Sequence, residues 1–513
     1  MTVSSSRSSS RRAMLLATLC APMLSGCFMV GPHYHRPHPV ISAHFKEAPQ
    51  PPPGWQVAQP QMAEATKGEW WKIYNDPQLD ALEAQVALSN QNLKQYEAQF
   101  RKAEALIDSI RAQLFPTLSG TFSFNRNSQG SQSRSASSGT VVNYTQTTTV
   151  NTWNTGPSAS WTLDVWGRIR RQVQEEVTAA QASAADVANA RLSYQSELAQ
   201  DYFQLRYQDS LRQLYARNVE YYKHALDIVQ NQVNAGVTDP TSLLQARYQL
   251  QSTQAQETNA GLLRAQYEHA IAVLIGKAPA DLTIPEGTLA TALPPLPNAV
   301  PSSLLQRRPD VAAAERNMES YNSEIGYQIA AFFPDISVSA SYGYSGNPLQ
   351  TLIQAGTRFW SLGASSTETL FNGGARSAAV REAEADYDNS VATYRQTVLT
   401  ALQNVEDNFS NLRILHQQYL QQIEAVHSAE EAVRVSLNEY LAGTQTYTTV
   451  ITSQQNALSY EVQALSIQEQ LATSHVALIV QLGGGWDVSQ LPSKDSLQTN
   501  NPLLPGFIQK TKE

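Results

Sequence analysis

The side chain with the clearest potential chemistry is the thiol of Cys27, near the start of this 513-residue chain. Arginines precede an apolar run at residues 13–24, and Ser25 and Gly26 separate that run from the cysteine. A basic start, a short apolar run and small residues are typical of a secretion signal. We therefore expect residues 1–26 to be a signal peptide that is absent from the mature protein.

The segment "LSGC", which ends at Cys27, resembles the lipobox of bacterial lipoproteins. This resemblance implies cleavage before Cys27 and three acyl chains on it, and several chains anchor a protein stably where one does not. Phe28 stands where lipoproteins retained at the inner membrane usually carry aspartate, which favours the outer membrane. An ordinary signal with an incidental cysteine is the alternative. Cys20 leaves with the signal, so no disulfide is expected in the mature chain.

The remaining reactive residue types form no catalytic or metal-binding pattern. Four histidines follow the cysteine without cysteine or carboxylate partners at ligand spacing: His33, His35, His38 and His44. A solvated, proline-rich linker explains them better than a metal site. The segment "LGGGW" at 482 does not join a strand to a helix, and there is no P-loop or nucleophile-elbow motif. We expect neither an enzyme nor a cofactor, apart from covalent lipid on Cys27.

Composition excludes further classes of protein. The chain has 36 basic and 44 acidic residues, a net charge of −8, which argues against a nucleic-acid surface. Beyond the signal no run of 18 apolar residues occurs, so a membrane-spanning helix is not expected.

The chain contains an internal duplication. The segment "DVWGRIR" at 164 is echoed by "LFNGGAR" at 370, and "NAGVTDPTSLLQA" at 234 by "YLAGTQTYTTVITSQ" at 440. The offsets agree, since Gly167 and Gly373 are 206 residues apart and Gly236 and Gly443 are 207 apart. Self-similarity of this kind indicates one structural unit used twice. Repeat 1 carries about 12 extra residues in a polar tract at 127–149, which composition predicts to be a loop at a hairpin tip.

Each repeat has two segments with the alternation of strands. After Pro334 the odd positions are hydroxyl or glycine residues, while the even positions are apolar or aromatic. The stretches 117–124 and 153–165 alternate in the same way, and a fourth, poorer strand is expected around 359–371. A soluble sandwich would also alternate. Next to a lipidated N-terminus, strands that face lipid outside and water inside explain the pattern better.

Four strands cannot close a membrane barrel, because the smallest such barrels have about eight. Open strand edges in lipid would leave backbone groups unpaired, at a cost of several kcal/mol each. The barrel must therefore be shared between several chains.

Long helices follow the strands in both repeats. No proline occurs between Ala375 and Leu441, and apolar residues recur there at coiled-coil spacing. The stretch Ile169 to Ala235 is its counterpart in repeat 1. More than sixty helical residues extend about 100 Å at 1.5 Å each, which exceeds a compact domain. Their apolar faces require neighbouring helices, which again indicates an oligomer.

Six ordered motifs resemble the TolC-like outer-membrane efflux factors, in particular the lipoprotein branch of the OprM and NodT type. They are "VGPHYHRP" at 30, "WWKIYNDPQLDAL" at 70, "LDVWGRIRR" at 163, "LLQRRPDVAAAE" at 304, "LFNGGARSAAV" at 370 and "LGGGW" at 482. The resemblance implies a homotrimer with a 12-stranded transmembrane β-barrel and a periplasmic α-barrel of coiled-coil helices. It also implies the exit duct of a tripartite efflux pump, with a periplasmic adaptor and an inner-membrane transporter as partners.

In this family the helix turns at the periplasmic end close the duct and dock the adaptor. The matching residues here are Gly236, Asp239, Ser242, Tyr440, Gly443, Gln445, Tyr447, Thr449 and Thr452. The two glycines also suit left-handed turn positions, a purely structural role. Relatives commonly carry acidic residues where this chain has Ser242, Thr449 and Thr452. We therefore expect hydroxyl hydrogen bonds and tyrosine packing in place of a charged gate.

These features give an expected domain plan and function. After the signal peptide come a lipid-anchored segment at 27–76, repeat 1 at 77–287 and a proline-rich linker at 288–301. Repeat 2 occupies 302–487, with a tail at 488–513. In each repeat we expect a helix, a strand hairpin and two helices. The expected function is small-molecule export across the outer membrane, and a non-conducting structural or secretory lipoprotein scaffold is the alternative.

Overall fold

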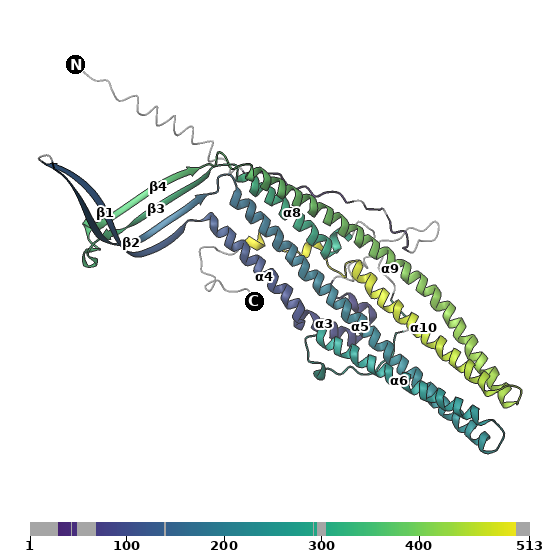
Figure 1. The fold of residues 1–513 in the computed structure, drawn as a ribbon. Coiled ribbons are helices and arrows are strands. Elements are labelled where there is room, and N and C mark those ends of the chain that lie inside the picture. Colours follow the sequence, from purple (N-terminus) through teal and green to yellow (C-terminus); the bar gives the residue numbers. More distant parts are fainter. Residues whose placement is uncertain are drawn as a thin grey trace.

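A computed structural model describes residues 29–39, 41–42, 44–48, 68–137, 140–290, 292–294 and 304–498. Four strands form a sheet at one end of an elongated molecule, and long helices extend away from it (Figure 1). This mainly helical architecture with four strands confirms the expected fold class. No helix within these ranges is both long and apolar enough to cross a membrane. Cys27 and the signal sequence lie outside the described residues.

The two halves of the chain contain corresponding elements. The first half contains α3 (Pro77–Ser89), α4 (Gln91–Arg111), β1 (Thr117–Ser137), β2 (Thr140–Leu163), α5 (Arg168–Asn234) and α6 (Pro240–Leu274). The second contains α7 (Leu304–Arg307), α8 (Pro309–Ala330), β3 (Asp335–Gly346), β4 (Arg358–Thr367), α9 (Ala375–Leu441) and α10 (Tyr447–Gln481). A short 3-10 helix, η2 (Trp70–Tyr74), precedes α3.

The strands form one antiparallel sheet in the order β1-β2-β3-β4. The register aligns Leu118 with Ala159, Ala159 with Ala340, and Ala340 with Leu362, so one apolar row crosses the whole sheet. The next row aligns serines across all four strands. The sheet therefore has one apolar and one hydroxyl-rich face, as its alternation predicts.

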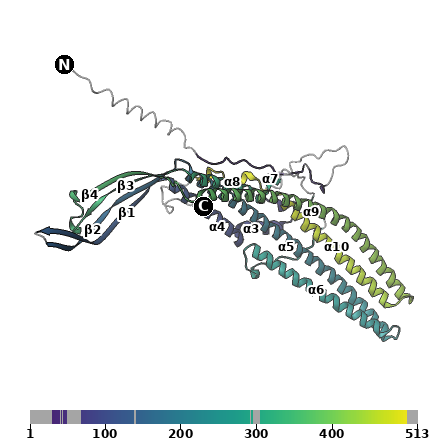
Figure 2. The ribbon, with the colours of Figure 1, turned by 45° about the horizontal axis from the view of Figure 1, so that its top comes forward.

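The polar tract at 127–149 is not the loop predicted from its composition. The two strands run through it and stay in register from Asn127 opposite Val150 to Ser137 opposite Thr140. The prediction was wrong because serine and threonine were treated as loop formers, although threonine, valine and tyrosine favour strands. The β1–β2 hairpin is consequently much longer than β3–β4 and projects beyond it (Figure 2).

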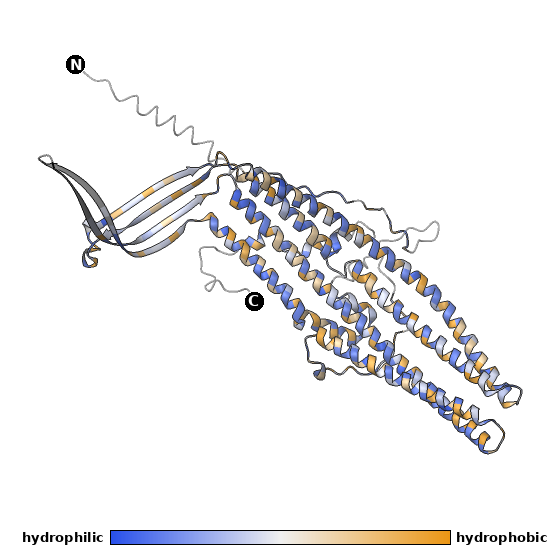
Figure 3. Cartoon of the chain, in the orientation of Figure 1, coloured by the Kyte–Doolittle hydropathy of each residue, from blue (hydrophilic) through white to orange (hydrophobic). Residues whose placement is uncertain are grey.

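Two helical hairpins dominate the rest of the molecule. Helices α5 and α9 have 67 residues each, about 100 Å at the usual rise, and α9 has the bounds that the absence of proline predicted. Helix α6 returns along α5 and α10 returns along α9, while α8 lies between α5 and α9 (Figure 1). Polar and apolar residues alternate along all of these helices (Figure 3).

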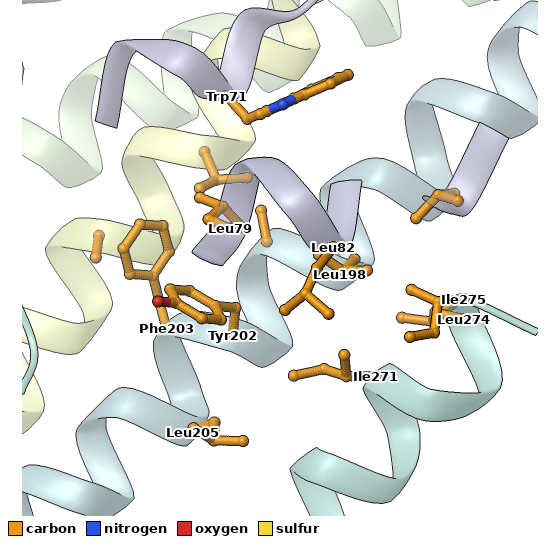
Figure 4. Close-up of a cluster of buried hydrophobic side chains, with 14 of the residues drawn as sticks. Trp71, Leu79, Leu82, Leu198, Tyr202, Phe203, Leu205, Ile271, Leu274 and Ile275 are labelled. Atoms are coloured by element: carbon orange, nitrogen blue, oxygen red, sulfur yellow. The ribbon is translucent and has the colours of Figure 1, made fainter. Parts of the chain in front are cut away.

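The largest buried cluster lies midway along the helices, where α3 and η2 pack against α5, α6 and α10. Trp70 is fully buried there. Leu79, Leu198 and Ile271 are also fully buried, and Tyr202 and Phe203 join them (Figure 4). Helix α3 ends and α4 begins at Asn90, whose side chain accepts from the Leu93 amide at 2.9 Å. This break lets α3 follow the cluster while α4 continues toward the sheet (Figure 1).

Candidate functional site

The helix turns furthest from the sheet are held by backbone geometry. Gly236 and Gly443 have φ values of 70° and 75°, in the left-handed region where only glycine is unstrained. The amide of Thr444 donates to the Glu439 carbonyl at 2.9 Å, which satisfies a carbonyl at the end of α9. Both glycines therefore have the structural role that their position suggests.

Asp239 is the only charged residue in residues 230–246 and 440–460. Its carboxylate caps α6 by accepting from the amide of Thr241 at 2.8 Å and from its hydroxyl at 2.9 Å. These hydrogen bonds lower the pKa of Asp239. The one carboxylate in this region is thus committed to capping its own helix.

Tyr440 and Tyr447 pack together at the second turn, with ring centroids 5.1 Å apart. Tyr447 is buried beside Val229 and Ala246 of the first helical hairpin, and this burial raises its pKa. The hydroxyl of Tyr440 donates to the side-chain carbonyl of Gln232 on α5. Both tyrosines therefore hold the α9–α10 hairpin against the α5–α6 hairpin.

Two further hydrogen bonds near the turns join the two hairpins through uncharged side chains. The hydroxyl of Thr448 donates to Gln245 Oε1 at 3.2 Å, and Gln455 Nε2 donates to Gln249 Oε1 at 2.6 Å. Sequence reasoning missed these glutamines, although Gln455 lies one residue from the position equivalent to Gln249, since the repeat offset here is 207 residues. That near-equivalence was a usable signal, because a repeat brings corresponding residues to a similar depth.

The remaining predicted gate residues make only local contacts. Thr449 donates to Gln445 Oε1 at 3.3 Å, and Thr452 donates to the Thr448 carbonyl at 2.9 Å. The amide of Ser242 donates to the Asp239 carbonyl at 3.0 Å within the first turn of α6. Among the predicted gate residues, Tyr440 and Tyr447 therefore make the contacts between the two hairpins within one chain.

Residues 29–39, 41–42 and 44–48 form a strap that starts at the root of the sheet and runs beside α8 and α9 (Figure 2). Its first residues are clamped by Arg171, which is buried and donates to the carbonyls of Val30 at 2.8 Å and Gly31 at 3.0 Å. A Cβ on Gly31 would lie 2.4 Å from the Cα of Gly326. Only glycines allow the strap to approach α8 this closely.

Further contacts hold the strap along its length. The hydroxyl of Tyr34 donates to Glu315 at 2.7 Å, and Arg36 donates to the hydroxyl of Tyr394 at 3.2 Å. Phe45 is buried against Phe409 in a small apolar cluster between α9 and α10. The Glu406 carboxylate accepts the amides of the next two residues, at 2.7 and 2.9 Å. The strap thus connects the sheet root to the middle of α9.

No group of three histidine, cysteine or acidic side chains suited to a metal ion occurs among the described residues. His33, His35, His38 and His44 belong to the strap. The structure therefore offers no site built for a metal in the parts of the chain it covers.

A family model described as "Outer membrane efflux protein" matches residues 82–277 and 300–484, well over half of the chain. This chain belongs to the outer membrane efflux protein family. Its members are transport proteins, and the chain is an outer-membrane efflux channel rather than an enzyme.

Individual relatives align with this chain along nearly its whole length. The chain is 27% identical to the probable efflux pump outer membrane protein TtgC of Pseudomonas putida, covering 93% of this chain and 96% of TtgC. It is 29% identical to the pyoverdine export outer membrane protein OpmQ of Pseudomonas aeruginosa, over 92% and 98%. The solved outer-membrane channel OprN aligns with a TM-score of 0.77 at 27% identity, over 89% of this chain and 99% of OprN.

Proposed function

We propose that three copies of this chain form the exit duct of a tripartite efflux pump, with a periplasmic adaptor and an inner-membrane transporter as partners. The observation that carries the proposal is the sheet, which has one apolar face and open edges at β1 and β4. Three chains of four strands close a 12-stranded barrel, and closure pairs the edge groups that lipid would leave unsatisfied.

The exposed residues of the sheet support an orientation with its apolar face toward lipid. Leu118, Trp360 and Leu362 are each more than 70% exposed in the single chain. Exposed apolar surface of this extent on a strand face is costly in water and suited to a bilayer. The helices then extend away from the membrane, and the turns at Gly236 and Gly443 lie at the periplasmic end.

We propose further that the mature chain begins at an acylated Cys27. The strap supports this, because the amide of Val30 donates to the Trp166 carbonyl at 3.2 Å, just beyond the end of β2. Cys27 precedes Val30 by three residues, a reach of about 10 Å. Acyl chains on Cys27 would therefore enter the bilayer beside the root of the barrel.

The exported compounds are proposed to be small molecules such as drugs or solvents. Relatives are named for toluene, antibiotic and pyoverdine export, so the relatives differ in cargo. Energy comes from the transporter, since the channel has no nucleotide-binding motif. The domain plan with boundaries at 26, 76, 287, 301 and 487 is part of the same proposal.

The test is deletion of the gene with the transporter and adaptor genes intact. Susceptibility to the pump's compounds should rise, and complementation should restore export. Unchanged accumulation of every compound that the pump carries would overturn the proposal. Planar bilayers separate the duct from a structural scaffold, because a scaffold conducts no current while a duct shows gated openings.

A further inference from the structure

The hydroxyl-rich face of the sheet carries no charge over most of its height. It consists of the odd positions of 117–123, 337–345 and 359–365 and the even positions of 154–162. Apart from Phe359, every residue at these positions is serine, threonine, asparagine or glycine. A single acidic or basic residue on this face would be repeated three times around a closed barrel, and none occurs at these levels.

The serines of this face lie in continuous rows across the strands rather than at isolated positions. The register joins Ser119, Ser158, Ser341 and Ser361 across the four strands. Neighbouring hydroxyls bond to each other, with Ser341 Oγ and Ser361 Oγ 2.7 Å apart. A hydroxyl is both a donor and an acceptor, so such a wall can solvate cations and anions alike.

Charged residues reappear where the sheet meets the helices, and three carboxylates there are paired with arginines. Asp164 lies 3.0 Å from Arg170, and Glu368 lies 2.6 Å from Arg376. Asp335 lies 3.9 Å from Arg168. Each pair has no net charge. These groups therefore contribute little electrostatic potential in the pore at distances beyond a Debye length of about 8 Å.

We propose that this uncharged hydroxyl wall makes the strand section of the duct indifferent to the sign of a solute's charge. Cationic, anionic and zwitterionic small molecules then pass it equally, and discrimination among them falls to other parts of the pump. The inference rests on the proposed function, because it needs the hydroxyl face to line the pore.

Thiol labelling of the full-length protein in lipid vesicles tests the wall directly. Ser341→Cys places a thiol on the hydroxyl face, and Ala340→Cys places one on the adjacent apolar face. Two methanethiosulfonate probes are compared, a trimethylammonium cation and a sulfonate anion, with the unsubstituted protein as a blank. Dividing each rate by that for free cysteine removes the intrinsic reactivity of the probe.

The corrected cation and anion rates at Ser341→Cys should agree within about threefold, whereas a charged wall would separate them by tenfold or more. Ala340→Cys should react with neither probe. A tenfold preference at Ser341→Cys overturns the inference, and so does labelling of Ala340→Cys in place of Ser341→Cys.

Current recordings in planar bilayers are a second test of the uncharged wall. Under a potassium chloride gradient, Ser341→Asp and Ser341→Arg should shift the zero-current potential in opposite directions from that of the unsubstituted protein. Absence of a shift in both variants would show that the wall does not influence permeation and would overturn the inference. A protein that conducts no current contradicts the proposed duct, whereas a conducting protein with unequal labelling contradicts only the neutral wall.

Discussion

Ionisation of Glu175 on α5 opposes folding. Burial raises its pKa to about 7, with help from the neighbouring charges of Glu324 and Glu176. A raised carboxyl pKa means that stability falls as pH rises from about 4.5 through 7. Glu175→Gln should therefore stabilise the protein at pH 8 by about 1–2 kcal/mol, after a discount for partial exposure, and have little effect at pH 4.5.

Thermal unfolding in detergent across this pH range measures the effect. Glu220 is an exposed control, because Lys223 lowers its pKa and ionisation there does not oppose folding. Glu220→Gln should bring no gain at pH 8. Equal pH profiles for Glu175→Gln and the unsubstituted protein would contradict the assignment.

The carboxylate of Asp209 on α5 connects its own helix with α6 and with the segment that follows α6. Its side chain is fully buried and lies 3.0 Å from Arg206 and 2.6 Å from Arg264, and it also accepts the Gly287 amide at 3.0 Å. Asp209→Asn would leave the buried guanidinium of Arg206 without a counter-charge and Arg264 with Glu268 alone, which should cost about 3–5 kcal/mol. Denaturant unfolding measures this loss.

The nearby exposed pair of Arg212 and Glu286 is the control for Asp209. Glu286→Gln should cost under about 1 kcal/mol, because solvent screens exposed ion pairs. Similar losses in both variants would argue against a special role of the buried carboxylate.

At the scale of elements, uncharged groups near the turns hold the α9–α10 hairpin to the α5–α6 hairpin. Tyr440→Phe removes the hydrogen bond to Gln232, worth about 1 kcal/mol in each chain. Single-channel recordings should then show a higher open probability. Because the lost contact is a hydrogen bond from a hydroxyl to a side-chain amide, with no ion pair involved, the increase should be the same at pH 6 and pH 8.

Tyr460→Phe is a matched control, since Tyr460 lies on α10 and is 38% exposed. It should open no more often than the unsubstituted protein. If Tyr440→Phe behaves like this control, the contact with Gln232 does not hold the duct closed.

Periodicity predicted the long helices and most of the strands, but not the outer part of the β1–β2 hairpin or the contacts that connect the elements. The absence of proline from Ala375 to Leu441 was sufficient to bound α9, because propagation continues until glycine residues end it. The alternation after Pro334 located β3 and its two faces. The hydrogen bonds of Gln232 with Tyr440 and of Arg171 with the Val30 carbonyl were not predictable, because each joins residues far apart in sequence. The break at Asn90 also escaped prediction, since its side-chain amide donates to the Leu274 carbonyl of α6.

For the whole molecule, we propose two membrane anchors, the acyl chains on Cys27 and the β-barrel. Substitution of Cys27 should separate their contributions. Cys27→Ser should lose palmitate labelling, yet part of the protein should still reach the outer membrane, because the barrel offers a larger apolar surface than the acyl chains. Fractionation and labelling in cells measure both quantities. Cys20→Ser is the control and should keep the label, since a mature chain that begins at Cys27 would lack residue 20. Persisting palmitate in Cys27→Ser would refute the lipid assignment.

The length difference between the two strand hairpins has a consequence for the cell surface. Residues 140–152 of β2 pair only with β1, so a two-stranded ribbon of about 40 Å extends past the last residue that pairs with β3. In an outer-membrane channel whose helices enter the periplasm, this ribbon points away from the cell. Three such ribbons around the pore would be the first parts that an antibody or bacteriophage meets. Because few contacts restrain their sequence, they are the natural place for antigenic variation and for an inserted epitope.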